Sequence, residues 1–499
     1  MNVLGVKCVG HDTGAALLSN GKVVALSEER LTRKKHSPGI FPEQSIEYCL
    51  NFLNCAPADI DLIVVAEERH QVGDFDVKDI FLRRMGARFA NARVESVNHH
   101  NAHAASAFFV SPFDEAAILI YDGFGEELKS HLGAVLETET LYVGRANSFA
   151  EIHKTVHHVK NGRTPYSNGI GMVYAKVCQK YLKLGRFNEG KMMGLAPYGN
   201  DSFLKQYPFE KWVRDDGRDI VLNPLISFAP SKLGGFSGAI KNPKKAMLLF
   251  WYGLGRLSKK ITQKATSRFR LKTQEELFEE IHLNIPARSG QALPDDYYTS
   301  VAYAVQKILE EVCLRFAKKL FAITRSENIC IAGGVGLNID ANRRILDESG
   351  FKHIFIQPAA SDAGIPLGAA LYGFHMILKQ PRFFNMQSAS LGRPYGDTEI
   401  RNAVETFKEK INFRKSTEAS KEAAKAISEN NIIGWFQGGS EYGPRALGNR
   451  SILCDARNPE MLTIVNKRVK QRELWRPFAA SVLLERVNVF LTLQSRVLS

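Results

Sequence analysis

The chain has 499 residues, which is too long for one hydrophobic core of ordinary size and predicts two or three domains. A hydrophobic content of 44% and a charged content of 24% exclude a disordered chain. The sequence lacks both a signal-peptide pattern and an apolar run of about 18 residues, so we expect neither export nor a membrane span. The seven scattered cysteines are typical of reduced thiols in a cytoplasmic protein.

The net charge of +14 is concentrated in one part of the chain. Residues 220–273 contain eleven Lys and Arg residues but no Asp or Glu. The apolar stretch A-M-L-L-F-W-Y-G-L-G-R-L lies inside this segment, so one interpretation is a basic amphipathic element for a membrane surface, an anionic substrate or a partner. A solvated basic insertion at about 220–274 explains the same charges, and we expect neither nucleic-acid binding nor membrane association.

A turn with the sequence H-D-T-G-A-A follows the first predicted strand, and its small residues allow a ligand to approach the backbone. His11 and Asp12 occupy this turn, and histidine is well suited to accept a proton near neutral pH. A histidine that only caps the turn explains the pattern equally well. The elements predicted here are strands at 3–9, 16–18, 22–26 and 62–66, with a hairpin turn at 19–21, and a helix at 42–52.

The next segment, V-N-H-H-N-A-H-A-A-S-A-F at 97–108, is predicted to be helical and to place His99 and His103 on one face. Such a pair also arises by chance on a buried helical face. However, the apolar strand A-A-I-L-I-Y-D-G delivers Asp122 at its carboxyl end, and Asp362 follows a later strand in a similar setting. Two imidazoles and two carboxylates suit Fe²⁺, Mn²⁺ or Zn²⁺ with open positions for substrate oxygens, so we predict a metal site.

A glycine-rich segment, G-R-F-N-E-G-K-M-M-G-L-A-P-Y-G, lies between the two halves of this part of the chain. Its density of glycines favours a loop that closes over a ligand, with Lys191 in contact with a nucleotide. A plain surface loop is the simpler alternative.

The second half repeats the order of strands and helices. A turn with the sequence G-G-V-G-L-N would let the backbone amides of Gly333, Gly334 and Gly336 approach a phosphate or an adenosine, and Asn338 would begin the next helix. Two such halves around a shared cleft predict a duplicated actin-like nucleotide-binding fold. The predicted elements are a helix at 299–321, strands at 328–332 and 353–356, and a small-residue helix after Asp362.

A proline- and serine-containing linker at 378–397 precedes a second predicted domain. Its elements are helices at 398–408 and 419–428 and strands at 411–414 and 432–437. The following turn, G-G-S-E-Y-G-P-R-A-L-G-N-R, carries Arg445, and Lys470 and Arg476 follow further on. Arginines fixed on a glycine-rich loop suit a phosphate or carboxylate substrate, and contact with a nucleic-acid backbone is the alternative.

Eight motifs in this order resemble the O-carbamoyltransferases of nodulation-factor and antibiotic biosynthesis. The motifs are H-D-T-G-A-A, S-E-E-R-L-T-R-K-K-H, H-H-N-A-H-A-A-S-A-F, D-G-F-G-E, G-K-M-M-G-L-A-P-Y-G, A-G-G-V-G-L-N, S-D-A-G-I-P-L-G-A-A and G-P-R-A-L-G-N-R-S-I-L.

The resemblance implies an α/β fold with two linked sites. A duplicated actin-like, ribonuclease H-like domain at 1–377 would be followed by a smaller YrdC-like α/β domain at 398–499. The YrdC-like domain would join carbamoyl phosphate and ATP, with Mg²⁺, into carbamoyl adenylate. The actin-like domain would then move the carbamoyl group to a hydroxyl of a small secondary metabolite.

The same resemblance assigns roles to individual residues. By motif, the family's ligands for an iron-like divalent ion match His99, His103, Asp122 and Asp362. Its proposed general base matches His11, which lies next to Asp12. Its contacts with carbamoyl phosphate and nucleotide match Arg445, Lys470 and Arg476.

The similarity to the family ends after about Asn488, where the chain continues as V-F-L-T-L-Q-S-R-V-L-S. The stretch that completes the YrdC-like site in the family has no counterpart here. We therefore expect an incomplete YrdC-like domain and a weakened adenylation step. A catalytically impaired remnant that binds nucleotide and metal and has a regulatory role is the alternative hypothesis.

Overall fold

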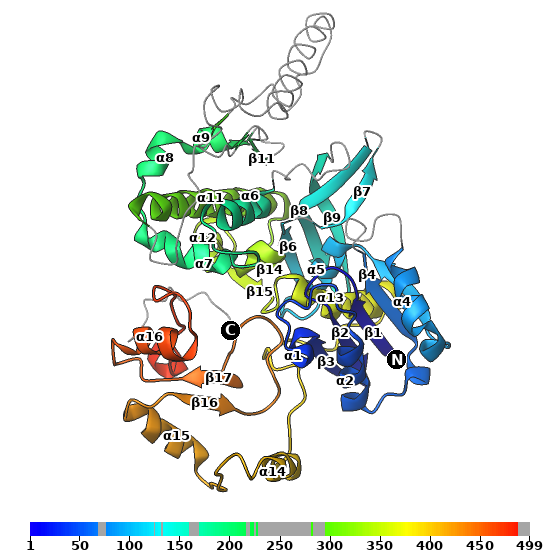
Figure 1. The fold of residues 1–499 in the computed structure, drawn as a ribbon. Helices are drawn as coiled ribbons and strands as arrows, with labels where there is room; N and C mark the ends of the chain where they lie inside the picture. The colour runs from blue at the N-terminus through cyan, green and yellow to red at the C-terminus, as the bar shows by residue number, and fades with distance from the viewer. Residues whose placement is uncertain are drawn as a thin grey trace, which may run out of the picture. The chain divides into compact units, whose positions relative to one another are not determined.

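The computed structural model describes residues 1–67, 76–123, 125–130, 133–158, 169–215, 220–223, 226–227, 281–282 and 295–487 (Figure 1). The chain forms two compact units, one of Met1–Val173 with Leu309–Ser499 and the other of Tyr174–Ile308. Most of the predicted basic insertion and the segment after residue 487 lie outside the described residues. Within the described ranges, no helix combines the length and the apolar composition that a bilayer crossing requires.

The first hundred residues form a five-stranded sheet in the order β3-β2-β1-β4-β5. Strand β2 pairs antiparallel with β1 and β3, whereas β1, β4 and β5 run parallel. The predicted hairpin is confirmed, and its turn residues Asn20 and Gly21 both have positive φ angles. The strands are β1 (Asn2–Lys7), β2 (Gly14–Ser19), β3 (Lys22–Ser27), β4 (Leu62–Ala66) and β5 (Arg93–Val97).

A six-stranded sheet repeats this arrangement. Its path is β15-β14-β6-β8-β7, and β9 also pairs with β8. As β1 does in the first sheet, β6 lies between an antiparallel strand, β8, and two parallel strands, β14 and β15. The duplication predicted from the sequence is therefore present in the strand order. The strands are β6 (Glu115–Tyr121), β7 (Glu127–Ser130), β8 (Gly133–Arg145), β9 (Ser148–His158), β14 (Asn328–Ala332) and β15 (His353–Ile356).

Two helices that contain several small residues, α5 (His99–Phe108) and α13 (Ile365–Tyr372), pack closely against each other near the two sheets (Figure 1). A Cβ atom on Gly368 of α13 would lie 1.8 Å from the carbonyl oxygen of Ala102 in α5. On the first sheet, a Cβ atom on Gly5 would lie 2.1 Å from the carbonyl oxygen of Pro366. The glycines thus allow α13 to contact both α5 and β1. The other helices near the first sheet are α1 (Glu29–Thr32), α2 (Glu43–Leu53) and α4 (Val77–Met85).

Replacing Gly368 with Ala should lower the free energy of unfolding by about 3 kcal/mol, because the added methyl group must push two packed backbones apart. Gly190, in a helix where a Cβ atom would meet no other atom, is the matched control. There Gly190→Ala should raise stability by about 0.5–1 kcal/mol. Urea unfolding followed by circular dichroism measures both variants. Equal stability of Gly368→Ala and the parent would show that the two helices do not pack this closely.

The segment predicted as a glycine loop at 185–199 is partly a helix, α7 (Glu189–Leu195), so the prediction of a loop is wrong for those residues. Closure over a ligand stays a prediction. Met192, Leu195 and Ala196 lie three and four positions apart and are buried, and this spacing makes an apolar helical face. The remaining helices and strands between residues 170 and 348 are α6 (Ile170–Lys176), α8 (Ser202–Gln206), α9 (Phe209–Trp212), β10 (Val213–Asp215), β11 (Ile220–Leu222), β12 (Ile226–Ser227), β13 (Ile281–His282), α11 (Asp296–Thr324) and α12 (Ile339–Glu348).

Residues 378–396 belong to the first unit and contain no helix or strand. Arg382 of this segment donates to the carbonyl oxygens of Phe108, which ends α5, and of Ser111 and Phe113 just beyond it. The amide of Met386 donates to the carbonyl oxygen of Val110 at 2.8 Å. The segment predicted as a linker therefore has fixed contacts, while the predicted domain limits stay a prediction.

The carboxy-terminal region contains α14 (Asp397–Thr406), α15 (Ala419–Ser428), the antiparallel pair β16 (Ile433–Phe436) and β17 (Arg450–Leu453), and α16 (Met461–Ile464). The predicted strand at 411–414 is wrong. These residues are exposed, and Arg414 pairs with Glu422 instead of lying in a ladder. A strand needs a hydrogen-bonded neighbour, and β16 takes β17 as its partner. The YrdC-like assignment of this region stays a prediction.

Candidate functional site

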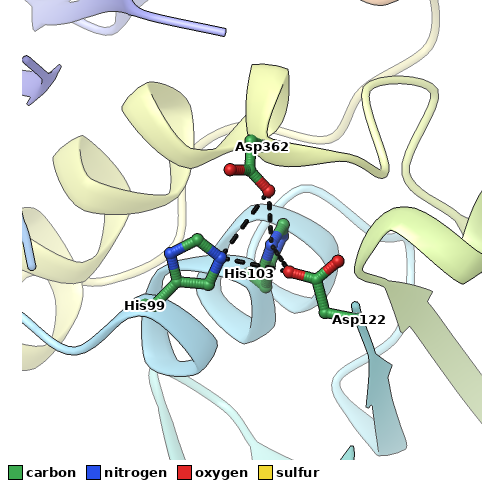
Figure 2. A group of neighbouring side chains, drawn as sticks. All are labelled: His99, His103, Asp122 and Asp362. Atoms are coloured by element: carbon green, nitrogen blue, oxygen red, sulfur yellow. Dashed lines mark hydrogen bonds and ion pairs between the residues drawn. The ribbon is translucent and has the colours of Figure 1, made fainter. Parts of the chain in front are cut away.

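The four predicted metal ligands converge in the first unit (Figure 2). His99 and His103 come from the first two turns of α5, Asp122 follows β6, and Asp362 begins the short helical turn before α13. The Nε2 atom of His99 lies 3.2 Å from Asp122 Oδ2 and 3.6 Å from Asp362 Oδ1. The Nε2 atom of His103 lies 3.7 and 3.8 Å from the same two oxygens. One donor atom from each residue lies within 4.8 Å of the others.

Each carboxylate presents one oxygen to the imidazoles and has its other oxygen held elsewhere. Asp122 Oδ1 accepts hydrogen bonds from the amides of Gly123, at 2.8 Å, and Gly334, at 3.0 Å. Asp362 Oδ2 lies 3.4 Å from the ammonium of Lys7. The remaining oxygens, Asp122 Oδ2 and Asp362 Oδ1, face the two histidines. This arrangement fixes both carboxylates as single-oxygen donors.

The electrostatics of the cluster favour ionised carboxylates. Burial alone would raise the pKa of Asp122, but His103 and His99 hold it well below its ordinary value. Burial opposes ionisation of Asp362 too, and Lys7 and His99 still hold its pKa well below the usual range. Burial would lower the pKa of His99, but Asp362 and Asp122 outweigh it and raise that pKa well above 6.5. The two carboxylates therefore remain ionised near neutral pH.

The donor set fits a divalent transition metal. Two imidazole nitrogens and two carboxylate oxygens lie close to one another, and all four residues are at least nine-tenths buried. His103 Nε2 makes no hydrogen bond, although it is buried and faces two carboxylates. A cation between these atoms would use that nitrogen and balance the two negative charges. The choice among Fe²⁺, Mn²⁺ and Zn²⁺ stays a prediction.

His11, the predicted proton acceptor, lies beside this cluster. Its Nδ1 atom is 3.0 Å from Asp12 Oδ2 and 3.9 Å from Asp362 Oδ2. On its other side, Asp12 Oδ1 lies 2.8 Å from Nδ1 of His36. Burial would lower the pKa of His11, but Asp362 and Asp12 outweigh that effect and raise it. A hydrogen bond from Nδ1 to Asp12 leaves Nε2 as the nitrogen that can accept a proton.

Two residues of this arrangement, Lys7 and His36, were not predicted from the sequence. Lys7 was hidden inside the strand V-L-G-V-K-C-V, although a lysine in the middle of an apolar strand is itself a signal of a buried ion pair. His36 ends the motif S-E-E-R-L-T-R-K-K-H and has a positive φ of 61°. Its contact with Asp12 depends on the path of a loop, which residue spacing does not reveal.

A buried polar network fixes the start of α5, where His99 lies. The Asn98 side chain caps the helix, since its Oδ1 accepts from the amide of Asn101 at 3.1 Å. Its Nδ2 donates to Glu137 Oε1 at 3.0 Å, and Lys154 lies 2.8 Å from Glu137 Oε2. Burial would raise the pKa of Glu137, but His100 and Lys154 outweigh it and lower that pKa to about 2. Asn98 therefore joins the helix to an ionised, buried carboxylate.

Replacing Asn98 with Asp should lower the free energy of unfolding by about 2–3 kcal/mol, because a second carboxylate would then face buried Glu137. The cap itself would survive, since Asp and Asn are equally good in that position. Asp76, which caps α4 at an exposed position and accepts from the amide of Lys78, gives the matched control Asp76→Asn. That exchange should change stability by no more than about 0.5 kcal/mol. Urea unfolding measures both variants. Similar losses of unfolding free energy would show that the charge of Glu137 does not destabilise the Asn98→Asp variant.

The glycine turn predicted to bind nucleotide lies against the end of β6. A Cβ atom on Gly333 would lie 2.2 Å from the carbonyl oxygen of Tyr121, and one on Gly334 would lie 2.9 Å from Asp122 Oδ1. Asn338 caps α12, because its side chain accepts from the amide of Ala341 at 3.0 Å. Close packing thus explains two of the glycines, and nucleotide binding at Gly333, Gly334, Gly336 and Asn338 stays a prediction. Lys191 lies on α7, in the second compact unit, and is half-buried.

The predicted carbamoyl-phosphate residues lie in the carboxy-terminal region. Arg445 and Lys470 are exposed, and the guanidinium of Arg476 lies 3.7 Å from Glu473. The loop that carries Arg445 is organised by Glu441, whose Oε1 accepts from the amides of Leu447, Asn449 and Arg450. Their role in binding stays a prediction.

The fold and the site define an α/β protein with a duplicated sheet and a buried cluster of two histidines and two aspartates next to a third histidine. Sequence comparison matches residues 2–86, 76–207 and 240–371 to the amino-terminal part of the carbamoyltransferases and residues 424–497 to their carboxy-terminal part. The carboxy-terminal match runs past Asn488, so the expectation that the similarity ends there is wrong. The chain belongs to the carbamoyltransferase family, as the eight motifs predicted.

Relatives of this chain occur in several bacteria. The uncharacterized protein sll1178 of Synechocystis is 31% identical over 99% of this chain and 77% of its own length. Nodulation protein NolNO of Sinorhizobium fredii is 30% identical over 97% of this chain, and NolO of Bradyrhizobium diazoefficiens is 29% identical over 80%. The chain spans only 64% and 60% of the length of these two nodulation proteins.

Among solved structures, HypF from T. kodakarensis aligns with 76% of this chain and 47% of its own, at 14% identity and a TM-score of 0.39. A likeness of this degree is too low to assign an activity.

Proposed function

We propose that this protein is an O-carbamoyltransferase that moves a carbamoyl group from carbamoyl phosphate to a hydroxyl of a small secondary metabolite. The activated intermediate is carbamoyl adenylate. Water releases inorganic phosphate from carbamoyl phosphate to give carbamate, and a carbamate oxygen then forms a bond to the α-phosphorus of ATP while pyrophosphate leaves. Membership of the carbamoyltransferase family supports the transfer of a carbamoyl group. The observation that carries the proposal is the position of His11, whose Nδ1 lies 3.9 Å from Oδ2 of Asp362 in the four-donor cluster.

In this proposal, His11 accepts the proton of the acceptor hydroxyl at Nε2 while Asp12 holds Nδ1. The hydroxyl oxygen forms a bond to the carbamoyl carbon, and the bond between that carbon and the phosphate oxygen of the adenylate breaks. AMP leaves with the electron pair of that bond. His36 holds the other oxygen of Asp12 and so keeps the carboxylate turned toward His11.

His99, His103, Asp122 and Asp362 would hold the divalent metal. Bound there, the metal would act as a Lewis acid on the carbamoyl carbonyl or on a phosphate oxygen. Contacts within the chain already orient Asp122 and Asp362 for metal binding. Backbone amides hold Oδ1 of Asp122, and Lys7 lies beside Oδ2 of Asp362. Little reorganisation of the chain is then needed around the reacting group.

A test of the proposed function uses the purified protein with [¹⁴C]carbamoyl phosphate, ATP, Mg²⁺ and Mn²⁺, with and without a panel of sugars and amino sugars. The expected result is release of AMP and pyrophosphate that depends on carbamoyl phosphate, together with label in a carbamate ester. Nucleotide that remains unchanged under all conditions would contradict catalysis and would favour the regulatory remnant. Pyrophosphate release without label in any sugar would instead mean that the panel does not contain the acceptor.

A further inference from the structure

Lys7 is a fully buried lysine in a central strand. It ends β1, which pairs with β2 on one side and with β4 on the other, and its side chain has 0% exposure. Its ammonium donates to the carbonyl oxygens of Val9, at 3.2 Å, and His11, and it lies 3.4 Å from Asp362 Oδ2. Three acceptors from two distant parts of the chain therefore surround one buried charge.

Burial of the Lys7 ammonium costs free energy, and its contacts link two parts of the site. Removing an ammonium from water is unfavourable unless charged and hydrogen-bonding partners compensate, so a buried lysine without a role is rarely retained. The two carbonyl oxygens belong to the turn that carries His11, and Asp362 belongs to the metal cluster. Lys7 is thus a direct bridge between the proton acceptor and one of the predicted metal ligands.

Lys7 could serve either to retain a metal ion or to position the groups around it, and its charge distinguishes these two roles. A positive charge next to the donor cluster weakens binding of a cation by Coulomb repulsion. A residue that served only to retain a metal would therefore carry no positive charge at this position. The contacts of Lys7 instead determine where the His11 turn lies and which oxygen of Asp362 faces the imidazoles.

We infer that Lys7 is a positioning residue of the transfer site, which ties the His11 turn to Asp362 and leaves only Oδ1 of that carboxylate for a metal ion. The inference rests on the proposed function for its effect on turnover. Its effect on cation affinity does not depend on that function. Loss of Lys7 should accordingly lower turnover without lowering the affinity for a cation.

The test compares Lys7→Met with the parent in the full chain. Met keeps the length of the side chain but removes the charge and all three contacts. Turnover, measured as AMP release dependent on carbamoyl phosphate with water as the acceptor, should fall at least tenfold in kcat, while the KM for carbamoyl phosphate stays within about twofold. Affinity for Mn²⁺, measured from free Mn²⁺ by electron paramagnetic resonance, should stay equal or rise by on the order of tenfold.

Lys22, exposed on β3 of the same sheet, gives the matched control Lys22→Met, which should change neither quantity. Lys7→Arg keeps the charge but cannot place a planar guanidinium at all three acceptors. Its affinity for Mn²⁺ should match that of the parent, and its kcat should lie between those of the parent and Lys7→Met. If Lys7→Met does not fold, the Arg variant decides the question, and a kcat within twofold of the parent would overturn the inference.

A parallel loss of Mn²⁺ affinity and turnover in Lys7→Met would overturn the inference, because Lys7 would then serve only to maintain the metal site. An unchanged kcat would overturn it as well. A parent protein that releases no AMP would refute the proposed function instead. In that event the Mn²⁺ affinities of the Met and Arg variants still decide whether the charge of Lys7 opposes the cation.

Discussion

Asp122→Asn should lower the affinity for Mn²⁺ by more than about 100-fold and reduce AMP release to background. The reason lies in the two amides that bind Asp122 Oδ1, those of Gly123 and Gly334. An amide NH₂ group cannot accept these hydrogen bonds, so the oxygen of Asn must take the place of Oδ1. The NH₂ group would then face His99 and His103, where a metal requires a lone pair. The substitution keeps the shape of the side chain and reverses its polarity.

The matched control for Asp122→Asn is Asp79→Asn, which makes the same chemical change at an exposed position on α4. It should leave the affinity for Mn²⁺ and the release of AMP unchanged. Titration calorimetry with Mn²⁺ and with Zn²⁺ measures the first quantity in both variants. Retention of one tightly bound ion per chain in Asp122→Asn would mean that this carboxylate is not a ligand.

The parts of the fold predicted most accurately are those whose sequence pattern is local. Asn20 and Gly21 determine the hairpin by their own backbone preferences, and the apolar run Asn328–Ala332 has the same bounds in the sequence prediction and in the structure. The wrong predictions concern segments whose secondary structure depends on contacts with other parts of the chain. Residues 411–414 have the composition of a strand but pair with no neighbouring strand. The helix Glu189–Leu195 forms because Met192 and Leu195 bury one face, and its glycines concealed that pattern.

The site was predictable to the extent that metal chemistry restricts residue types. His99 and His103 share a helical face, and Asp122 and Asp362 each follow a strand, so four unusual residues in suitable places indicated one cluster. The residues that support this cluster have no comparable sequence pattern. Lys7 reaches Asp362 across 355 positions in the chain, and only the pairing of two elements in space reveals the contact.

His11→Gln should slow AMP release by roughly 10²–10⁴-fold and leave the affinity for Mn²⁺ unchanged. Gln keeps a polar side chain in the turn but cannot accept a proton, and His11 is not among the four donors of the cluster. Its effects therefore differ from those of Asp122→Asn, which should weaken cation binding and remove turnover together. His353→Gln, at the start of β15, is the matched control and should leave both quantities at the parental level.

A rapid-quench experiment locates the step at which His11 acts. Since His11 would remove a proton only during transfer, His11→Gln should still release pyrophosphate in the first turnover, at a rate close to that of the parent. Release of AMP should lag behind it, because the carbamoyl adenylate has no proton acceptor beside its attacking hydroxyl. If pyrophosphate release slowed by the same factor as AMP release, His11 would act in the formation of the adenylate. In that case the turn that Lys7 and Asp12 hold in place would belong to the first half-reaction and not to the second.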